Sequence, residues 1–147
     1  MSKWTKGQDY TAEAPSNNCP GCPGISLTAP LGLASAGYQY TLPSSITHLE
    51  VQGTISDLGS SNCGASNDMV CNNEWRIWPP GSGDGVDTTT PGGENQGSLI
   101  SFDGSFLCGT SRVVIVAENT YGLTRAIFEV TRSGGLCAVS ALSLIHI

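Results

Sequence analysis

The stretch that decides the fold is Arg112-Val113-Val114-Ile115-Val116-Ala117-Glu118, which is apolar at both odd and even positions. Because alternate side chains of a β-strand point to opposite sides, this run predicts a central strand that is covered on both faces. A turn, Asn119-Thr120-Tyr121-Gly122, follows it, and Ala126, Phe128 and Val130 then recur at every second position. The pair of strands indicates a packed all-β domain.

Upstream, residues 46–55 alternate with a period of two. One side of this segment carries Leu49, Val51, Gly53 and Ile55, and the other carries His48, Glu50, Gln52 and Thr54. The pattern predicts a half-buried strand with a polar face toward solvent. Weaker runs at 25–27 and 38–42 add strands, and no segment has a helical period with caps. We expect about seven strands in an all-β sandwich.

Regular alternation fails from Asp57 to Gly97, apart from Glu74-Trp75-Arg76-Ile77-Trp78. The flanking residues are Gly, Ser, Asn, Asp and Thr, so a long loop insertion is predicted, and loops of this length are usually functional or mobile. Order returns at Ser98, where apolar runs flank Asp103-Gly104. An Asp-Gly pair in this setting predicts a two-residue hairpin turn.

Composition excludes two classes of partner. Only 12% of the residues are charged, the net charge is −6, and the cations are two lysines near the N-terminus and four scattered arginines. A groove that follows nucleic-acid phosphates needs clustered Lys and Arg, so no nucleic acid is expected. No apolar run approaches the roughly 18–20 residues of a membrane-spanning helix, so no membrane span is expected.

The cysteines indicate the compartment. The six are Cys19, Cys22, Cys63, Cys71, Cys108 and Cys137. An even number in a chain rich in Gly, Ser and Thr predicts disulfides and an extracellular or cell-surface location. The first four are also a candidate zinc set, and Cys19-Pro20-Gly21-Cys22 has the spacing of a redox motif. Disulfides are favoured, because no helix follows the motif and the second pair is widely spaced.

Three segments are expected. Residues 1–23 are polar and proline-rich and are predicted to be a linker or tail, residues 24–132 carry the fold, and residues 133–147 form a C-terminal tail. The last six residues, Leu142-Ser143-Leu144-Ile145-His146-Ile147, look like the translation of a sequencing adapter. We therefore leave 142–147 out of the fold and expect the chain to be a fragment of a longer protein.

A family resemblance rests on the two strands described first. Val113-x-Ile115-x-Ala117-x-Asn119-x-x-Gly122, followed by Ala126-x-Phe128-x-Val130, resembles the last two strands of bacterial immunoglobulin-like and PKD-like extracellular domains. The segment 75–81 is similar to the strand that carries the core aromatic residue in those domains. The resemblance covers roughly residues 24–132 and implies an immunoglobulin-like β-sandwich of about seven antiparallel strands. Ile115 stands where an antibody-type domain has the second cysteine of its inter-sheet disulfide.

The resemblance also bears on the disulfides. In such a sandwich the chain alternates between two ends. Cys19, Cys22, Cys63 and Cys71 would then gather at one end, and Cys108 and Cys137 at the other. On this topology we predict Cys108–Cys137 and Cys63–Cys71, with Cys19–Cys22 or a cross-pairing left over.

The function that the resemblance implies is a non-catalytic extracellular module, acting as a spacer or adhesion unit of a larger secreted or surface protein. Its partners would be the neighbouring domains of the same chain and a glycan or protein ligand. The sequence has no nucleophile elbow, no His-Glu-x-x-His pair and no P-loop. We therefore do not expect an enzyme.

The alternative is a carbohydrate-binding module that uses the loop 57–97 and Trp78. Trp75 and Trp78 are three positions apart, so they lie on opposite faces of their strand. Trp75 shares its face with Ile77 and is expected in the core. Trp78 then faces outward or toward the loop, where it would either stack on a sugar or pack under the long loop. Asp84 and Asp87, together with Glu94, lie in a Gly-rich loop. Such oxygens suit calcium, but Asp and Gly also form turns, so no cofactor is predicted.

Overall fold

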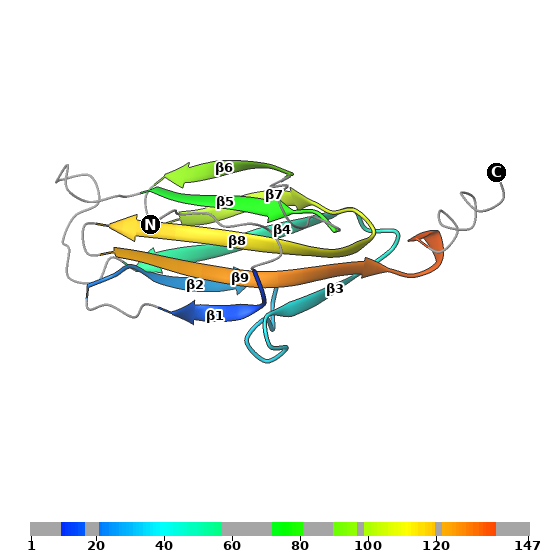
Figure 1. Ribbon diagram of the computed structural model, residues 1–147, viewed down its shortest axis with the longest axis horizontal. Coiled ribbons are helices and arrows are strands. Elements are labelled where there is room, and N and C mark those ends of the chain that lie inside the picture. Colours follow the sequence, from blue (N-terminus) through cyan, green and yellow to red (C-terminus); the bar gives the residue numbers. More distant parts are fainter. Residues whose placement is uncertain are drawn as a thin grey trace.

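The computed structural model describes residues 10–16, 21–56, 72–80, 90–96, 99–119 and 122–137. These residues form nine strands in two facing sheets (Figure 1). The strands are β1 (Glu13–Ser16), β2 (Gly24–Ala29), β3 (Gln39–Pro43), β4 (His48–Ser56), β5 (Asn72–Trp78), β6 (Thr90–Gln96), β7 (Leu99–Ser105), β8 (Gly109–Asn119) and β9 (Gly122–Ser133). Within the described residues, no helix is long and apolar enough to cross a membrane.

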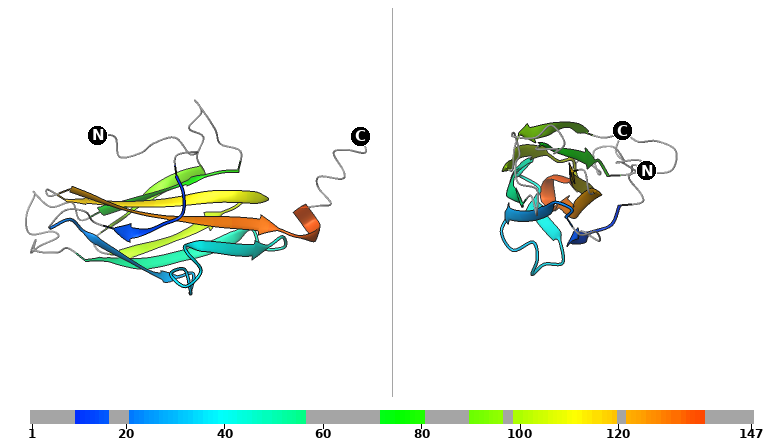
Figure 2. Two further views of the ribbon diagram at one scale, coloured as in Figure 1. Left: turned by 60° about the horizontal axis from the view of Figure 1, so that its bottom comes forward. Right: turned by 90° about the vertical axis from the view of Figure 1, so that its left-hand side faces the viewer.

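The two sheets differ in size. The larger has the order β1-β9-β8-β5-β6, with β3 also paired to β9, and the smaller has the order β2-β4-β7. All pairings are antiparallel except β3 with β9, which is parallel over Gln39–Pro43. Figure 2 shows the elongated sandwich from a second side and along its long axis. The all-β sandwich expected from the sequence is therefore observed, with one parallel pair that the alternation does not encode.

The strand count exceeds the expected seven because two edge strands lack an alternating pattern. β1 lies in the segment predicted to be a linker, and it pairs with β9 through Glu13↔Ile127 and Ser16↔Arg125. β6 lies in the predicted loop insertion and pairs with β5 alone. An edge strand needs only backbone partners on one side, so its side chains need not alternate.

The prediction that the strand β8 is covered on both of its faces is confirmed. Val113, Ile115 and Ala117 face the core between the sheets, where each is at most 2% exposed. Val114 and Val116 face the opposite side and belong to a second apolar cluster. The members of this outer cluster are Tyr10, Trp78, Val114, Val116 and Ile127, with Leu123 packed against it.

The hairpin turn predicted at Asp103-Gly104 is wrong. β7 continues through both residues, with Asp103 paired to Glu50 and Gly104 paired to Leu49. A Cβ atom at Gly104 would lie 2.9 Å from a ring carbon of Phe106. This glycine is explained by the close approach of an aromatic ring in the core and not by a turn.

The described cysteines lie at the two ends of the sandwich. Cys22 is buried and disulfide-bonded, and it lies two residues before Gly24, which pairs with Ser56 at one end of the smaller sheet. Cys108 and Cys137 form a disulfide at the other end, as predicted, with their Cα atoms 5.7 Å apart. Cys19, Cys63 and Cys71 lie outside the described residues, so the remaining pairings stay predictions.

Candidate functional site

The structure removes Trp78 from the candidate binding residues. Trp78 is on the outer face of the larger sheet, as its spacing from Trp75 predicted, but its exposed fraction is 0%. The ring of Tyr10 covers it, with centroids 4.6 Å apart. The prediction of an exposed Trp78 is wrong because residues ahead of β1, assigned to a linker, pack on this face. A ring without exposed surface offers no face to a sugar.

Trp75 behaves as predicted. Its ring packs against the core between the sheets and stacks on Phe102 of β7, with centroids 4.1 Å apart and ring planes 5° apart. Because β5 and β7 belong to different sheets, this stack ties the two sheets together. Aromatic pairs of this kind contribute about 0.5–1.5 kcal/mol beyond the area that they bury.

The other candidate ligand-binding residues, Asp84 and Asp87, lie outside the described residues. Glu94 belongs to β6, for which only the backbone is described. Cys22 is in a disulfide, so in this state its sulfur is not a thiolate ligand for zinc. Across the described part of the chain, no group of three or more His, Cys, Asp and Glu residues is placed to hold a metal ion.

A polar depression lies on the outer face of the smaller sheet. It has a volume of about 390 Å³ and is lined by Glu50, Ser101, Phe102 and Asp103. The alternation of β4 and β7 produces it: Glu50 stands directly opposite Asp103 in the strand pair, and both are exposed. The sequence predicted the polar face of β4 correctly, but it gave no sign that β7 adds a second carboxylate at the same level.

Two contacts order this depression. The Nε2 of Gln52 donates a hydrogen bond to Oε1 of Glu50 at 2.6 Å. The Nδ1 of His48 lies 3.6 Å from Oδ2 of Asp103, and the two side chains are 59% and 65% exposed. A contact so open to solvent contributes at most about 1 kcal/mol. The depression can accept hydrogen bonds from hydroxyl or amide groups of a ligand, but it does not exclude water from its carboxylates.

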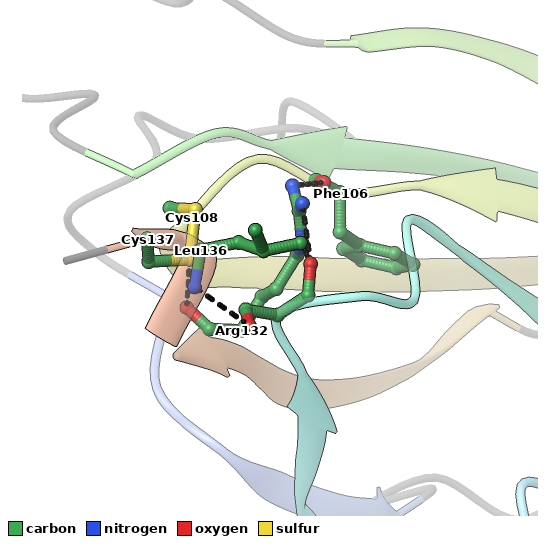
Figure 3. Close-up of a disulfide and its surroundings, with 6 residues drawn as sticks. Phe106, Cys108, Arg132, Leu136 and Cys137 are labelled. Atoms are coloured by element: carbon green, nitrogen blue, oxygen red, sulfur yellow. Dashed lines mark hydrogen bonds between the residues drawn. A yellow bond between two sulfur atoms is a disulfide. The ribbon is translucent and has the colours of Figure 1, made fainter. Parts of the chain in front are cut away.

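A second ordered region surrounds the Cys108–Cys137 disulfide (Figure 3). Arg132 of β9 is its centre. Its Nε and Nη2 donate to the backbone oxygen of Ser44 at 3.1 and 2.7 Å, and its Nη1 donates to the oxygen of Phe106 at 3.1 Å. Sequence reasoning missed this role, since a single arginine in an alternating strand carries no sign of the loops that it joins.

The comparisons with known proteins give no relatives. No match to this chain was found among models of protein families, among curated proteins or among solved structures.

Proposed function

We propose that this chain is a non-catalytic, extracellular immunoglobulin-like module that serves as a spacer or adhesion unit in a larger secreted or surface protein. The observation that carries the proposal is the strand order. An immunoglobulin-like sandwich has strands A, B and E adjacent in one sheet and strands C, F and G in the other. β2-β4-β7 and β5-β8-β9 have this order, and β6 beside β5 corresponds to the additional strand of variable-type domains.

The path of the chain supports the spacer role. β9 carries the chain to one end of the elongated sandwich (Figure 1), beyond which Cys137 is joined to Cys108. A connection to a further domain that left from this end would run along the long axis, as an array of domains joined end to end requires.

The extracellular location is supported by the disulfides. Cys108–Cys137 and the disulfide of Cys22 are features that reducing compartments disfavour. The partners that we propose are neighbouring domains of the same polypeptide. For the adhesion role, the polar depression at Glu50 and Asp103 is the ligand surface that the described residues offer.

The test of the module proposal is the sequence of the complete gene. We expect the open reading frame to continue past the codon of Ala141 into further domains and to encode an export signal. A cytosolic product, or a reading frame that encodes this domain alone, would contradict the proposal.

The carbohydrate-binding alternative, expected at the loop 57–97 and Trp78, has a separate test at the polar depression, because Trp78 is buried. Purified protein is applied to a glycan array beside the variants Glu50→Gln and Asp103→Asn. Saturable binding that both variants abolish would assign a glycan ligand to the depression and would exclude a role as a spacer alone, which predicts no saturable binding.

A further inference from the structure

We propose that Cys108 is a site of reversible thiol–disulfide exchange, at which a low-molecular-weight thiol opens the Cys108–Cys137 disulfide and becomes bound to Cys108 while the sandwich stays folded. Three observations carry this inference: the exposure of Cys108, a hydrogen-bond acceptor beside Cys137, and a set of hydrogen bonds from Arg132 that holds this end of the sandwich. The inference goes beyond the proposed function and does not depend on it, because exchange requires only this domain and a thiol.

The two cysteines of this disulfide differ in their access to solvent. Cys108 is exposed, in the connection between β7 and β8, whereas Cys137 is half-buried. Cys22, which belongs to another disulfide, is only 1% exposed. Exchange begins when a thiolate attacks one sulfur of a disulfide, so its rate depends on which sulfur can be approached. An incoming thiolate therefore reaches the Cys108–Cys137 disulfide from the side of Cys108.

The exchange step is a nucleophilic displacement. The sulfur of the incoming thiolate forms a bond to the Sγ of Cys108, and the bond between the two protein sulfurs breaks, with its electron pair going to the Sγ of Cys137. That thiolate takes a proton from water and becomes a thiol. One thiol and one disulfide enter the reaction and one of each leaves it, so no further oxidant or reductant is consumed. Attack by Cys137 on the mixed disulfide reverses the step.

The displaced cysteine has a hydrogen-bond acceptor beside it. The Sγ of Cys137 lies 3.6 Å from the backbone oxygen of Arg132 (Figure 3). A sulfur in a disulfide carries no proton to donate, whereas the thiol that exchange produces is a weak donor and can use this oxygen. The Cα atoms of Cys108 and Cys137 are 5.7 Å apart. Exchange therefore leaves the Cys137 thiol with a partner and close to Cys108 for the reverse reaction.

The surrounding structure is held by bonds other than the disulfide. The guanidinium of Arg132 donates to the backbone oxygens of Ser44 and Phe106. The Oγ of Ser44 in turn accepts a hydrogen bond from the backbone N–H of Leu136 at 3.1 Å. β8 is paired with β9 along its whole length. None of these bonds requires the disulfide, so its opening loosens the segment around Cys137 locally and leaves the sandwich folded.

The first experiment measures how fast reduced glutathione opens this disulfide in the folded chain and in the chain unfolded by urea. Alkylation followed by peptide mapping follows Cys108 and Cys137 separately. A disulfide that is attacked only after global unfolding would react at least about a thousandfold more slowly in the folded chain, because folded molecules outnumber unfolded ones by that factor or more. We expect a difference of less than about a hundredfold, with glutathione attached to Cys108.

Two matched variants test the assignment to Cys108. Cys137→Ser leaves Cys108 as a free thiol, and Cys108→Ser leaves Cys137 as one, so the two variants lack the same disulfide and differ in the thiol that remains. We expect oxidised glutathione to modify the free Cys108 at least about tenfold faster than the free Cys137, because Cys137 is half-buried beside the Arg132 oxygen. Hydrogen exchange is the folding control, and the amides of β8 and β9 should be as protected in both variants as in the parent chain.

The outcomes decide between an exchange site and a purely structural disulfide. A rate in the folded chain more than about a hundredfold below the rate in urea, or loss of protection in β8 and β9 when the disulfide opens, would overturn the inference. Equal reactivity of the two free cysteines, or attachment of glutathione to Cys137, would also overturn it. A rate close to that in urea, with glutathione on Cys108 and protection retained, supports the exchange site even if the module proposal fails.

Discussion

The outer faces of the two sheets contrast strongly. On the smaller sheet, the outward residues of β4 are His48, Glu50, Gln52 and Thr54, and all are exposed. On the larger sheet, Trp78, Val114, Val116 and Ile127 face outward, and each is at most 3% exposed because the cluster that includes Tyr10 shields them. A polar outer face is stable in contact with water, whereas an apolar outer face has to be shielded from water by residues from elsewhere in the chain. The predictions below test this difference.

The largest effect is expected for Trp78→Ala. The side chain is fully buried, so its removal leaves a cavity in the outer cluster, and we expect a loss of about 3–5 kcal/mol in the free energy of unfolding. Chemical denaturation measures it. Trp78→Phe is the control, because it keeps an aromatic ring against Tyr10 and should recover much of the loss. A loss below about 1 kcal/mol in Trp78→Ala would mean that this face does not depend on its cover.

Tyr10→Ala removes the cover itself. Tyr10 is 1% exposed, contacts Trp78 and has the guanidinium carbon of Arg125 5.7 Å from its ring centroid. We expect a loss of about 3 kcal/mol, with Trp78 becoming accessible to solvent. Unfolding gives the first quantity, and quenching of tryptophan fluorescence by acrylamide gives the second. Tyr10→Phe keeps the ring and should leave quenching unchanged; increased quenching in that control would contradict the role of the ring as a cover.

Gly104→Ala tests the inner side of the smaller sheet. The added Cβ would lie 2.9 Å from the Phe106 ring and 3.0 Å from Cδ1 of Ile77. Both neighbours have to move, and overpacking of this kind costs about 1–3 kcal/mol. Denaturation measures the cost, and Ser105→Ala, at the exposed next position, is the control. An unchanged stability would show that the glycine is not required by packing.

The elements that sequence predicts well are those whose pattern is local. β8 has apolar residues at successive positions, and its double burial followed from them. The polar face of β4 likewise followed from alternation. The Cys108–Cys137 pair came instead from the topology that the immunoglobulin-like resemblance implies, which places these two cysteines at the same end of the sandwich.

The elements that sequence does not predict depend on distant partners. β1 consists of Glu13-Ala14-Pro15-Ser16, which has no strand pattern, and it forms because β9 offers a free edge. Arg132 and Ser44 are 88 residues apart, so no local rule connects them. Asp103-Gly104 has the local pattern of a turn, but the packing of Phe106 against β7 overrides it.

The smallest effect is expected on the polar face. Asp103→Asn removes the contact with His48 but also removes a carboxylate that stands opposite Glu50. Like charges directly opposite each other destabilise a strand pair, so removing the Asp103 carboxylate relieves a repulsion with Glu50. Losing the exposed contact with His48 costs little, and the two effects therefore oppose each other. We expect the free energy of unfolding to change by less than about 0.5 kcal/mol. Glu50→Gln, which keeps the His48 contact and removes the same repulsion, should be slightly more stable than Asp103→Asn. A loss above about 2 kcal/mol in the free energy of unfolding of either variant would show that the fold depends on this polar face as it depends on the outer face of the larger sheet. That result would contradict the contrast between the two faces.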